Sequence, residues 1–207
     1  MIYRQIQTEK SFKDFASKNM DALEALTTRK STAQLIDPAP DGPELEKIFT
    51  AAIRVPDHAC LRPWQFIVFK EEARAELGQI FCGALKLNDP NASDAAFDKE
   101  LKKPYRAPLV IAVIAKVQNH SKVPAIEQIL SAGAAAQNIM VSAHALGFAG
   151  IWRTGAPCYD GFVRERLGAK GEDQIVGFLY LGTAKSKPSM PDVSPSDYVM
   201  EWKAVKR

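Results

Sequence analysis

The chain has 207 residues, a length that suits one sizeable domain. Hydrophobic residues make up 46% and charged residues 25%, an ordinary globular composition that argues against global disorder. The formal net charge of +3 is small, and its cations are spread along the chain, so we expect no nucleic-acid partner. The longest apolar run, residues 108–115, is far shorter than the ~20 residues of a membrane span, so we expect no membrane partner either.

The cysteines and the first residues bear on the compartment. Cys60, Cys82 and Cys158 form no CxxC pair, and any single bridge would leave one of them unpaired, which favours a reduced, intracellular protein. Residues 1–18 are polar and mixed in charge and lack the apolar core of a signal peptide, so we interpret them as an N-terminal extension. We therefore expect a soluble, cytoplasmic protein.

Two helices are expected in the first quarter of the chain. The first begins at Asn19 and ends near Thr28, and it is followed by RKSTAQLIDPAP, whose prolines should prevent regular structure. The second begins at DGPE, where Asp41 is the expected N-cap, proline occupies the first turn and Glu44 completes a capping box. This helix ends in the stretch RVPDHACLRPWQF, residues 54–66, which concentrates charged and polar side chains in one turn.

The rest of the chain alternates between expected strands and helices. Apolar runs predict buried strands at WQFIVF, PLVIAVIAKV, GFAGIW and QIVGFLYLGTA. Helices are expected over residues 71–87, 127–146 and 157–167, and the small, apolar residues of the second of these predict that it is buried. The alternation predicts one mixed β-sheet covered by helices. The tail, residues 185–207, is rich in proline and serine before its aromatics, and we expect it to add a strand to another subunit.

The triplet RKS follows the first expected helix. Arg29, Lys30 and Ser31 supply a guanidinium, an ammonium and a hydroxyl within three residues, a set that suits an anionic phosphate. The ordinary alternative is a pair of cations that interact with the negative end of a helix dipole.

The turn at residues 54–66 is a second candidate anion site. Arg54 and His58 would face the anion, and Asp57 would orient His58 through a ring nitrogen. The alternative is a polar loop with an exposed histidine. A metal site of His58 with Cys60 lacks further ligands at a recognisable spacing, so we expect none.

The stretch GIWRTG, residues 150–155, ends a strand with polar side chains between glycines. Its glycines allow backbone amides to approach a ligand, Arg153 and Thr154 can donate hydrogen bonds, and Trp152 can cover an aromatic ring. The alternative is a strand-end turn with a core tryptophan. The chain has no GxGxxG motif, Walker lysine loop or GxSxG elbow.

The order of these motifs resembles that of the FMN-dependent NAD(P)H nitroreductases. RKS, RVPDH…RPWQF, AGAAAQNIMVSAHALGFAGIWRTG and VGFLYLGT occur in sequence, and the likeness extends from about Met20 to Ser186 and is closest to the compact subgroup with Asp-His after the second helix. The resemblance implies an α+β nitroreductase-like fold over residues 19–207. It also implies a homodimer that holds two FMN molecules at its interface, with the tail wrapped around the partner.

The resemblance also assigns site residues. Arg29, Lys30 and Ser31 would hold the ribityl-phosphate end of FMN, and Arg54 and His58 would reach the flavin from the other protomer. Trp152, Arg153 and Thr154 would contact the flavin, Gly155 would give backbone access, residues 144–149 would lie near the nicotinamide, and Lys185 or Lys187 would reach the phosphate. Ala33 stands where many relatives carry a cation near the N1/O2 edge of the flavin, so Arg153 or a backbone amide would have to compensate.

The function implied by the resemblance is a flavoenzyme that takes hydride from NAD(P)H. Electrons would pass to a nitroaromatic, quinone or similar electron-poor acceptor by a ping-pong mechanism. Because the flavin performs the chemistry, no side chain is assigned as nucleophile or general base. Two alternatives remain open: another reductive reaction on the same fold, such as dehalogenation, and a dimer that stores or senses FMN with little turnover.

Overall fold

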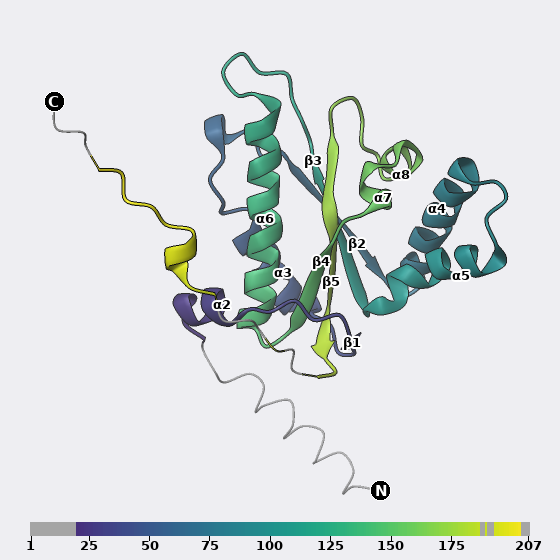
Figure 1. The fold of residues 1–207 in the computed structure, drawn as a ribbon, viewed down its shortest axis with the longest axis horizontal. Coiled ribbons are helices and arrows are strands. Elements are labelled where there is room, and N and C mark those ends of the chain that lie inside the picture. Colours follow the sequence, from purple (N-terminus) through teal and green to yellow (C-terminus); the bar gives the residue numbers. More distant parts are fainter. Residues whose placement is uncertain (1–19, 187–188, 190–192, 204–207) are drawn as a thin grey trace, which may run out of the picture.

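The structure is a computed structural model that describes residues 20–186, 189 and 193–203. The expected N-terminal extension and Lys187 lie outside these residues. In chain order the elements are α2 (Ala22–Thr28), β1 (Leu35–Ile36), α3 (Gly42–Ala52), η1 (His58–Cys60), β2 (Trp64–Lys70), α4 (Ala73–Asn88), α5 (Asp94–Lys102), η2 (Lys103–Arg106), β3 (Leu109–Ala115), α6 (Ala125–Ala145), β4 (Ala149–Arg153), α7 (Ala156–Tyr159), α8 (Gly161–Arg166), β5 (Gln174–Ala184) and η3 (Pro195–Asp197) (Figure 1). Within the described ranges, none of the helices combines the length and apolar character that crossing a membrane requires.

The five strands form one sheet. Its order is β1-β5-β3-β2, and β4 pairs with β5 beside β1. All four ladders between the named strands are antiparallel, and the parallel pairing is a single bridge between Ser31 and Gly150. The expected α+β architecture is confirmed, but the expectation of a mixed sheet is wrong for the ladders. The intervening helices return the chain so that each strand runs opposite to its neighbour.

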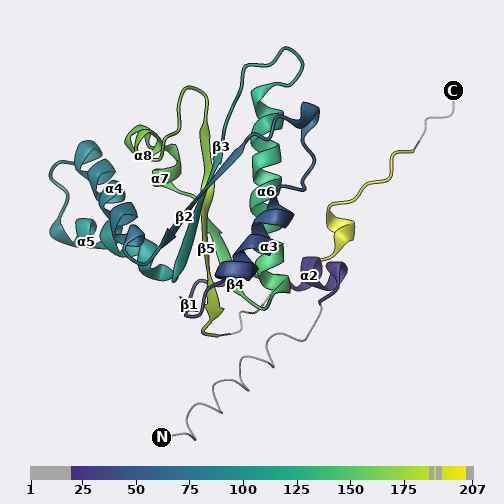
Figure 2. The same ribbon diagram turned by 180° about the vertical axis from the view of Figure 1, so that it is seen from behind.

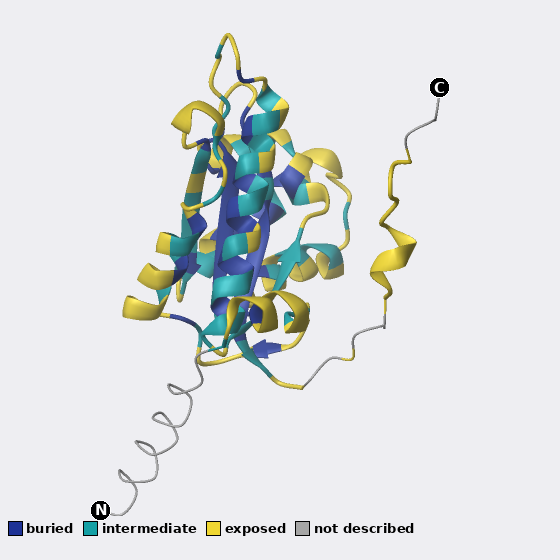
Figure 3. Cartoon of the chain, turned by 90° about the vertical axis from the view of Figure 1, so that its left-hand side faces the viewer, coloured by how far each residue is buried: buried dark blue, intermediate teal, exposed yellow. Residues whose placement is uncertain are grey.

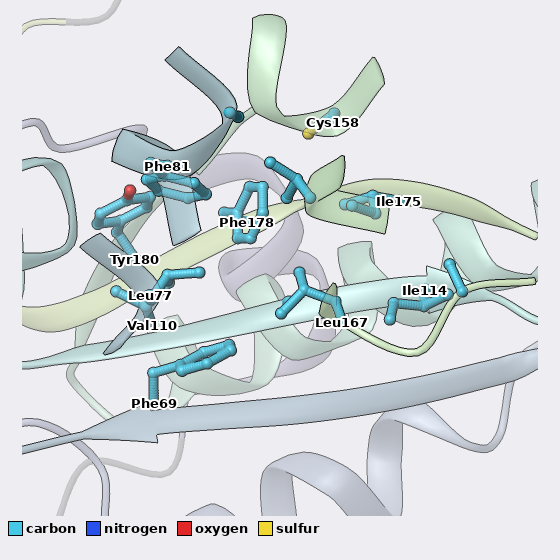
Figure 4. Packing of buried hydrophobic residues seen from close by; sticks show 14 of the residues in the cluster. Phe69, Leu77, Phe81, Val110, Ile114, Cys158, Leu167, Ile175, Phe178 and Tyr180 are labelled. Atoms are coloured by element: carbon cyan, nitrogen blue, oxygen red, sulfur yellow. The ribbon is translucent and has the colours of Figure 1, made fainter. Parts of the chain in front are cut away.

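Helices cover both faces of the sheet. Helices α2, α3 and α6 lie on one face, and α4, α5, α7 and α8 lie on the other (Figures 1 and 2). Strand β3 is completely buried between these layers, and its successive side chains alternate between two apolar clusters. On the α4 face, Val110 packs near Phe81 and Phe178, whose rings meet edge to face with centres 5.2 Å apart (Figure 4). This double-sided core fixes the strands that carry the candidate site.

Helix α6 buries one face only. Its small residues Ala132, Ala136 and Ala143 pack toward α3 and the sheet. The uncovered side of α6 is intermediate to exposed (Figure 3), and Ile126 and Leu130 are 59% and 63% exposed. The expectation that this helix is buried on nearly all sides is therefore not met within a single chain.

The N-terminal caps of the first two helices differ from the predicted ones. The N-cap of α2 is Asp21, whose Oδ1 accepts hydrogen bonds from the amides of Leu23 and Glu24 at 2.8 and 2.9 Å. At α3 the expected capping box does not form: the Asp41 carboxylate pairs with Lys70 of β2 and makes no hydrogen bond to the helix amides. An ion pair to a neighbouring strand has replaced the cap.

Other elements also differ from expectation. The two-residue strand β1 lies in the segment that was expected to lack regular structure, and β2 is an edge strand of which only Phe69 is buried. The expected helix over residues 157–167 is split into α7 and α8 at Asp160, whose Oδ1 accepts from the amide of Val163 at 3.0 Å. Helix α5 and the turn η2 were not predicted at all.

Candidate functional site

The first candidate motif lies where α2 ends against α6. Thr28 donates its hydroxyl hydrogen to the Glu24 carbonyl at 2.5 Å, so its oxygen accepts a hydrogen bond from Nε2 of His144 at 2.9 Å. Burial lowers the pKa of His144, and the neighbouring Arg29 guanidinium lowers it further. His144 is therefore a neutral imidazole that attaches the end of α2 to α6.

Backbone hydrogen bonds connect this motif to the sheet. Ser31 forms the parallel bridge with Gly150, and the amide of Thr32 donates to the Gly150 carbonyl at 2.9 Å. The amide of Lys185, just after β5, donates to the Gln34 carbonyl at 3.1 Å. The structure thus brings the RKS motif, the start of β4 and the expected cation Lys185 together at one end of the sheet.

Strand β4 leads from this end to the GIWRTG motif. Gly150 and Arg153 are about 10 Å apart along the strand at ~3.3 Å per residue. Trp152 points to the α6 side, where its Nε1 donates to the Val176 carbonyl at 3.2 Å. Arg153 points to the opposite face, where its Cζ lies 5.7 Å from the centre of the Tyr180 ring. A ligand that lies along β4 could therefore contact both motifs.

The chain opens at the end of β4. Gly155 has a φ of +93°, a conformation that favours glycine, and a Cβ built on it would meet no atom within 4 Å. Thr154 beside it is exposed. Both residues border a cavity of about 370 Å³, which is lined by Phe81, Lys103, Arg106, Ile151, Trp152, Arg153, Thr154, Gly155, Pro157, Phe178 and Tyr180.

The second candidate motif lies at the opposite end of α6. Arg54 is exposed just after α3, and His58 lies in η1. Nδ1 of His58 donates to Oε2 of Glu127 in the first turn of α6 at 2.7 Å. The expectation that Asp57 orients His58 is wrong, since Oδ2 of Asp57 accepts instead from the amide of Arg62 at 2.7 Å. The turn η1 directs the imidazole toward α6.

The two motifs of one chain are far apart. His144 and Glu127, their respective contacts on α6, are 17 residues apart in one straight helix. At about 1.5 Å per residue this separation is roughly 25 Å. Arg29 and His58 of the same chain therefore cannot bind the same phosphate.

Three charged residues of these sites were missed by sequence reasoning. Lys103 and Arg106 come from η2, which follows the unexpected helix α5. Ser93 was a usable signal, because it caps α5 by accepting from the amide of Ala96 at 3.3 Å. Glu127 gave no signal, since it lies 69 residues from His58 and only the fold brings them together. In the described ranges there is no cluster of three or more His, Cys, Asp or Glu side chains that could hold a metal ion.

Comparison with known proteins identifies relatives of this chain. The model of the nitroreductase family matches residues 26–183. "Putative NAD(P)H nitroreductase YdjA" from Escherichia coli K12 is 44% identical over 181 residues, covering 85% of this chain and 97% of YdjA. A Haemophilus influenzae protein of the same descriptive name is 38% identical over 169 residues, covering 81% of this chain and 91% of its own.

Solved structures share the fold at lower identity. A nitroreductase-like family protein from Bacillus cereus superposes with a TM-score of 0.75 at 20% identity and covers 89% of this chain and 97% of its own. The FMN and NADPH-dependent nitroreductase NfnB from sphigopyxis sp. strain HMH gives a TM-score of 0.69 at 19% identity, covering 89% and 100%. From the extent of the family match and the identity to its relatives, the chain belongs to the nitroreductase family.

Proposed function

We propose that this protein is a homodimeric FMN-dependent oxidoreductase that uses NAD(P)H to reduce nitroaromatic, quinone or similar electron-poor acceptors. The observation that carries the proposal is the arrangement along β4. The cation and hydroxyl of Arg29 and Ser31 lie at one end, β4 leads from there over about 10 Å to Arg153, and just beyond it the backbone of Gly155 is open beside a cavity with aromatic residues.

The chemistry of these residues fits FMN. Arg29, Ser31 and Lys185 supply donors for a phosphate at one end, where the backbone hydrogen bonds around Gly150 fix their position. Trp152 offers a ring surface, and Gly155 leaves its backbone open to a planar ligand. NfnB is by its description FMN- and NADPH-dependent, and YdjA is described as using NAD(P)H. We extend both cofactors to this chain.

The homodimer is proposed from surfaces that a single chain leaves uncovered. Ile126 and Leu130 are exposed near the N-terminal end of α6, and at its other end α2 carries the exposed residues Leu23 and Leu26. In the tail, the exposed large apolar side chains include Tyr198, Val199, Met200 and Trp202, in a segment that lies apart from the body of its own chain (Figure 3). Apolar surface of this extent is typical of an interface, and we assign it to a second copy that also receives the tail.

A two-fold axis across α6 would bring together the two motifs that lie far apart within one chain. It would pair the Arg29 end of one protomer with the His58 end of its partner and create two equivalent sites. Each site would then contain Arg29, Lys30, Ser31 and Lys185 from one chain and Arg54 and His58 from the other. Glu127 would orient His58 toward the ligand, and His144 would hold the phosphate-binding end of α2 in place.

When bound, FMN supplies hydride acceptance from NAD(P)H and electron transfer to the acceptor. The chain's own residues bind and orient it: Arg29 and Ser31 at the phosphate, Trp152 and the backbone of Gly155 beside the ring. Since one ring face would serve both substrates, the nicotinamide must leave before the acceptor binds.

The proposal is tested by spectroscopy and steady-state kinetics. Purified protein should show a flavin absorption spectrum that bleaches with anaerobic NADH or NADPH and recovers when a quinone or nitroaromatic is added. Initial rates at several acceptor concentrations should give parallel double-reciprocal lines. Bleaching without recovery by any acceptor in a panel that includes halogenated aromatics would favour a flavin store or sensor. A colourless protein that fails to bind added FMN would contradict the proposal.

A further inference from the structure

Residues 57–62 form the turn that carries His58, and its backbone is strained. Ala59, Cys60 and Arg62 have φ angles of +61°, +53° and +50°. These conformations cost energy for residues with a Cβ. Such a turn keeps its place only where the surrounding structure holds it.

Two hydrogen bonds within the turn set its shape but not its position. The amide of Cys60 donates to the Asp57 carbonyl at 3.2 Å. The amide of Arg62 donates to Oδ2 of Asp57 at 2.7 Å. Both bonds connect residues of the turn to each other. Contacts with other elements must therefore place the turn relative to α6, the helix across which the shared site is proposed to form.

A buried glutamine near the start of α6 fixes the loop that follows β3. Gln128 is only 1% exposed. Its Oε1 accepts from the Gln118 amide at 2.8 Å, and its Nε2 donates to the carbonyls of Gln118 and Val123 at 2.8 and 3.2 Å. Because one buried amide group binds both the N–H and the C=O of Gln118, the backbone at this residue is fixed to α6.

The side chain of Gln118 extends this attachment to the turn. Its Nε2 donates to the Leu61 carbonyl at 2.8 Å, and the two residues are 57 positions apart in the chain. Glu127, which precedes Gln128 in α6, contacts the imidazole of His58. Two adjacent residues of α6 thus hold the same turn. Glu127 holds it by the imidazole, and Gln128 holds it by a backbone carbonyl, through Gln118.

The backbone contact complements the contact with the imidazole. The side chains of His58 and Glu127 are 54% and 45% exposed, so water competes with their interaction. A ring that is bound at Nδ1 still moves with its own backbone. Binding of the Leu61 carbonyl, three residues further along, limits that movement and keeps Nε2 of the ring directed to one place.

We propose that Gln118 is a positioning residue: its hydrogen bond to the Leu61 carbonyl fixes the turn that presents His58 to FMN across the two-fold axis. The proposal rests on the function proposed above and adds a residue that no sequence motif identified. Arg54, the other residue expected to reach the flavin from this side, lies directly after α3, where its amide donates to the Ala51 carbonyl at 3.1 Å. Gln118 therefore acts through His58 and not through Arg54.

The test replaces Gln118, whose side chain is exposed, and leaves Gln128 in place. Gln118→Met keeps the length of the side chain and removes its donor, while the backbone groups at this position still satisfy Gln128. FMN titration of the apoprotein should give a dissociation constant roughly three- to tenfold higher than in the wild type, the range that one neutral hydrogen bond contributes.

A double-mutant cycle with His58→Ala measures whether Gln118 acts through the imidazole. In a protein that already lacks the imidazole, Gln118→Met should change the FMN dissociation constant by less than about twofold. A general loss of stability would not produce this dependence on His58. Gln174→Met is the matched control, because Nε2 of Gln174 also donates to a backbone carbonyl, that of Glu172 at 3.0 Å, in a different loop. Its FMN affinity should equal that of the wild type.

Hydrogen exchange of the apoprotein gives a readout that requires no flavin. The amides of residues 58–62 should exchange faster in Gln118→Met than in the wild type, because the turn is less firmly held. The amides of β3, at the centre of the sheet, should exchange equally in both proteins. Gln174→Met should match the wild type over residues 58–62.

Four results would overturn the proposal. Unchanged FMN affinity in Gln118→Met, where the wild type binds FMN, would overturn this inference and leave the proposed function standing. The same holds for an equal loss of affinity with and without His58, and for unchanged exchange over residues 58–62. A wild-type protein that binds no FMN would overturn the inference together with the proposed function.

Discussion

The two ends of α6 present similar polar side chains but are constructed differently. At the C-terminal end, the RKS motif is attached to the sheet by the bridge between Ser31 and Gly150 and by the amide of Thr32, a residue only 5% exposed. At the N-terminal end, His58 is attached to α6 through one contact with Glu127, and these two side chains are 54% and 45% exposed.

The backbone differs between the two ends as well. Around His58 the non-glycine residues Ala59, Cys60 and Arg62 all have positive φ, a conformation that costs energy for residues with a Cβ. The C-terminal end of α6, where the RKS motif lies, is therefore a rigid part of the sheet and is called the first end. The N-terminal end, where His58 lies, is a loop held by side chains and is called the second end. We expect changes at the first end to affect folding and flavin binding strongly, and changes at the second to have graded effects.

The largest expected effect is on stability, when a side chain is added to Gly150 at the first end, where β4 and β5 are in close contact. In Gly150→Ala the new Cβ would lie 2.9 Å from the carbonyl oxygen of Tyr180 and 2.6 Å from a methyl of Leu181. The backbone oxygen cannot move without distorting the β4–β5 ladder, so unfolding should cost about 1–3 kcal/mol less. Urea denaturation measures this loss. Gly161→Ala, whose Cβ would meet nothing within 4 Å, should unfold like the wild type, and equal stability of the two variants would contradict the comparison.

A somewhat smaller effect is expected for the cation of the first end. Arg29→Ala should lose a charge-assisted hydrogen bond to the phosphate worth roughly 1.5–3 kcal/mol, or about tenfold or more in FMN affinity. Flavin titration of the apoprotein measures the change. Arg166→Ala, which removes a cation that lies over the Phe162 ring away from β4, is the control and should bind FMN normally. Unchanged affinity in Arg29→Ala would remove Arg29 from the site.

A mixed dimer tests whether the two ends of α6 meet across the two-fold axis. One chain carries Arg29→Ala and the other His58→Ala, with different tags so that the mixed dimer can be purified. If sites are shared, one site collects both defects and its twin keeps both native residues, so about one FMN is held tightly per dimer. Uniformly weak binding at both sites would mean that each site lies within one chain. Each substitution must first be seen to weaken binding in its own homodimer.

Sequence reasoning recovered the parts of the fold that depend on local pattern. β3 and β5 were visible because apolar and β-branched residues predominate in a doubly covered strand, and α6 because its small residues continue for five turns. Helix α5 was missed because it is short, is rich in charged residues and buries none of its side chains completely.

The candidate site was predicted where a motif is continuous and missed where it is assembled by folding. The RKS and GIWRTG motifs were chosen as candidates because each is continuous in the chain, and their proximity depends on the bridge between Ser31 and Gly150. Arg106 and Glu127 carry no pattern that links them to β4 or to His58, since those neighbours are distant in sequence. Asp57 was chosen as the partner of His58 because it is adjacent, but adjacent side chains in an extended turn point in different directions.

A smaller effect on FMN affinity is expected when the carboxylate of Glu127 at the second end is replaced by an amide. Glu127→Gln weakens the contact that orients His58, and because both side chains are about half exposed, the loss should be roughly 0.2–1 kcal/mol. FMN affinity should fall by no more than several-fold. Asp57→Asn is the informative control, since Asp57 contacts the amide of Arg62 instead of the imidazole. If Asp57→Asn weakened FMN binding and Glu127→Gln did not, the pairing of His58 with Glu127 would be wrong.

The smallest expected effect is a pH dependence at the first end. Burial and the Arg29 charge lower the pKa of His144 below its ordinary value of 6.5, so the unfolded chain binds a proton at higher pH than the folded protein does. The stability that this histidine contributes is thus complete above about pH 6.5 and is lost as the pH falls through the lower pKa of the folded state. His144→Gln keeps a donor for the Thr28 oxygen but removes the titration, so its free energy of unfolding should fall less between pH 8 and pH 5 than that of the wild type. His120→Gln, in a loop far from α2, is the control for general acid effects. Urea denaturation at a series of pH values measures the slopes, and a steeper fall in His144→Gln than in the wild type would mean that the folded protein favours the charged imidazole.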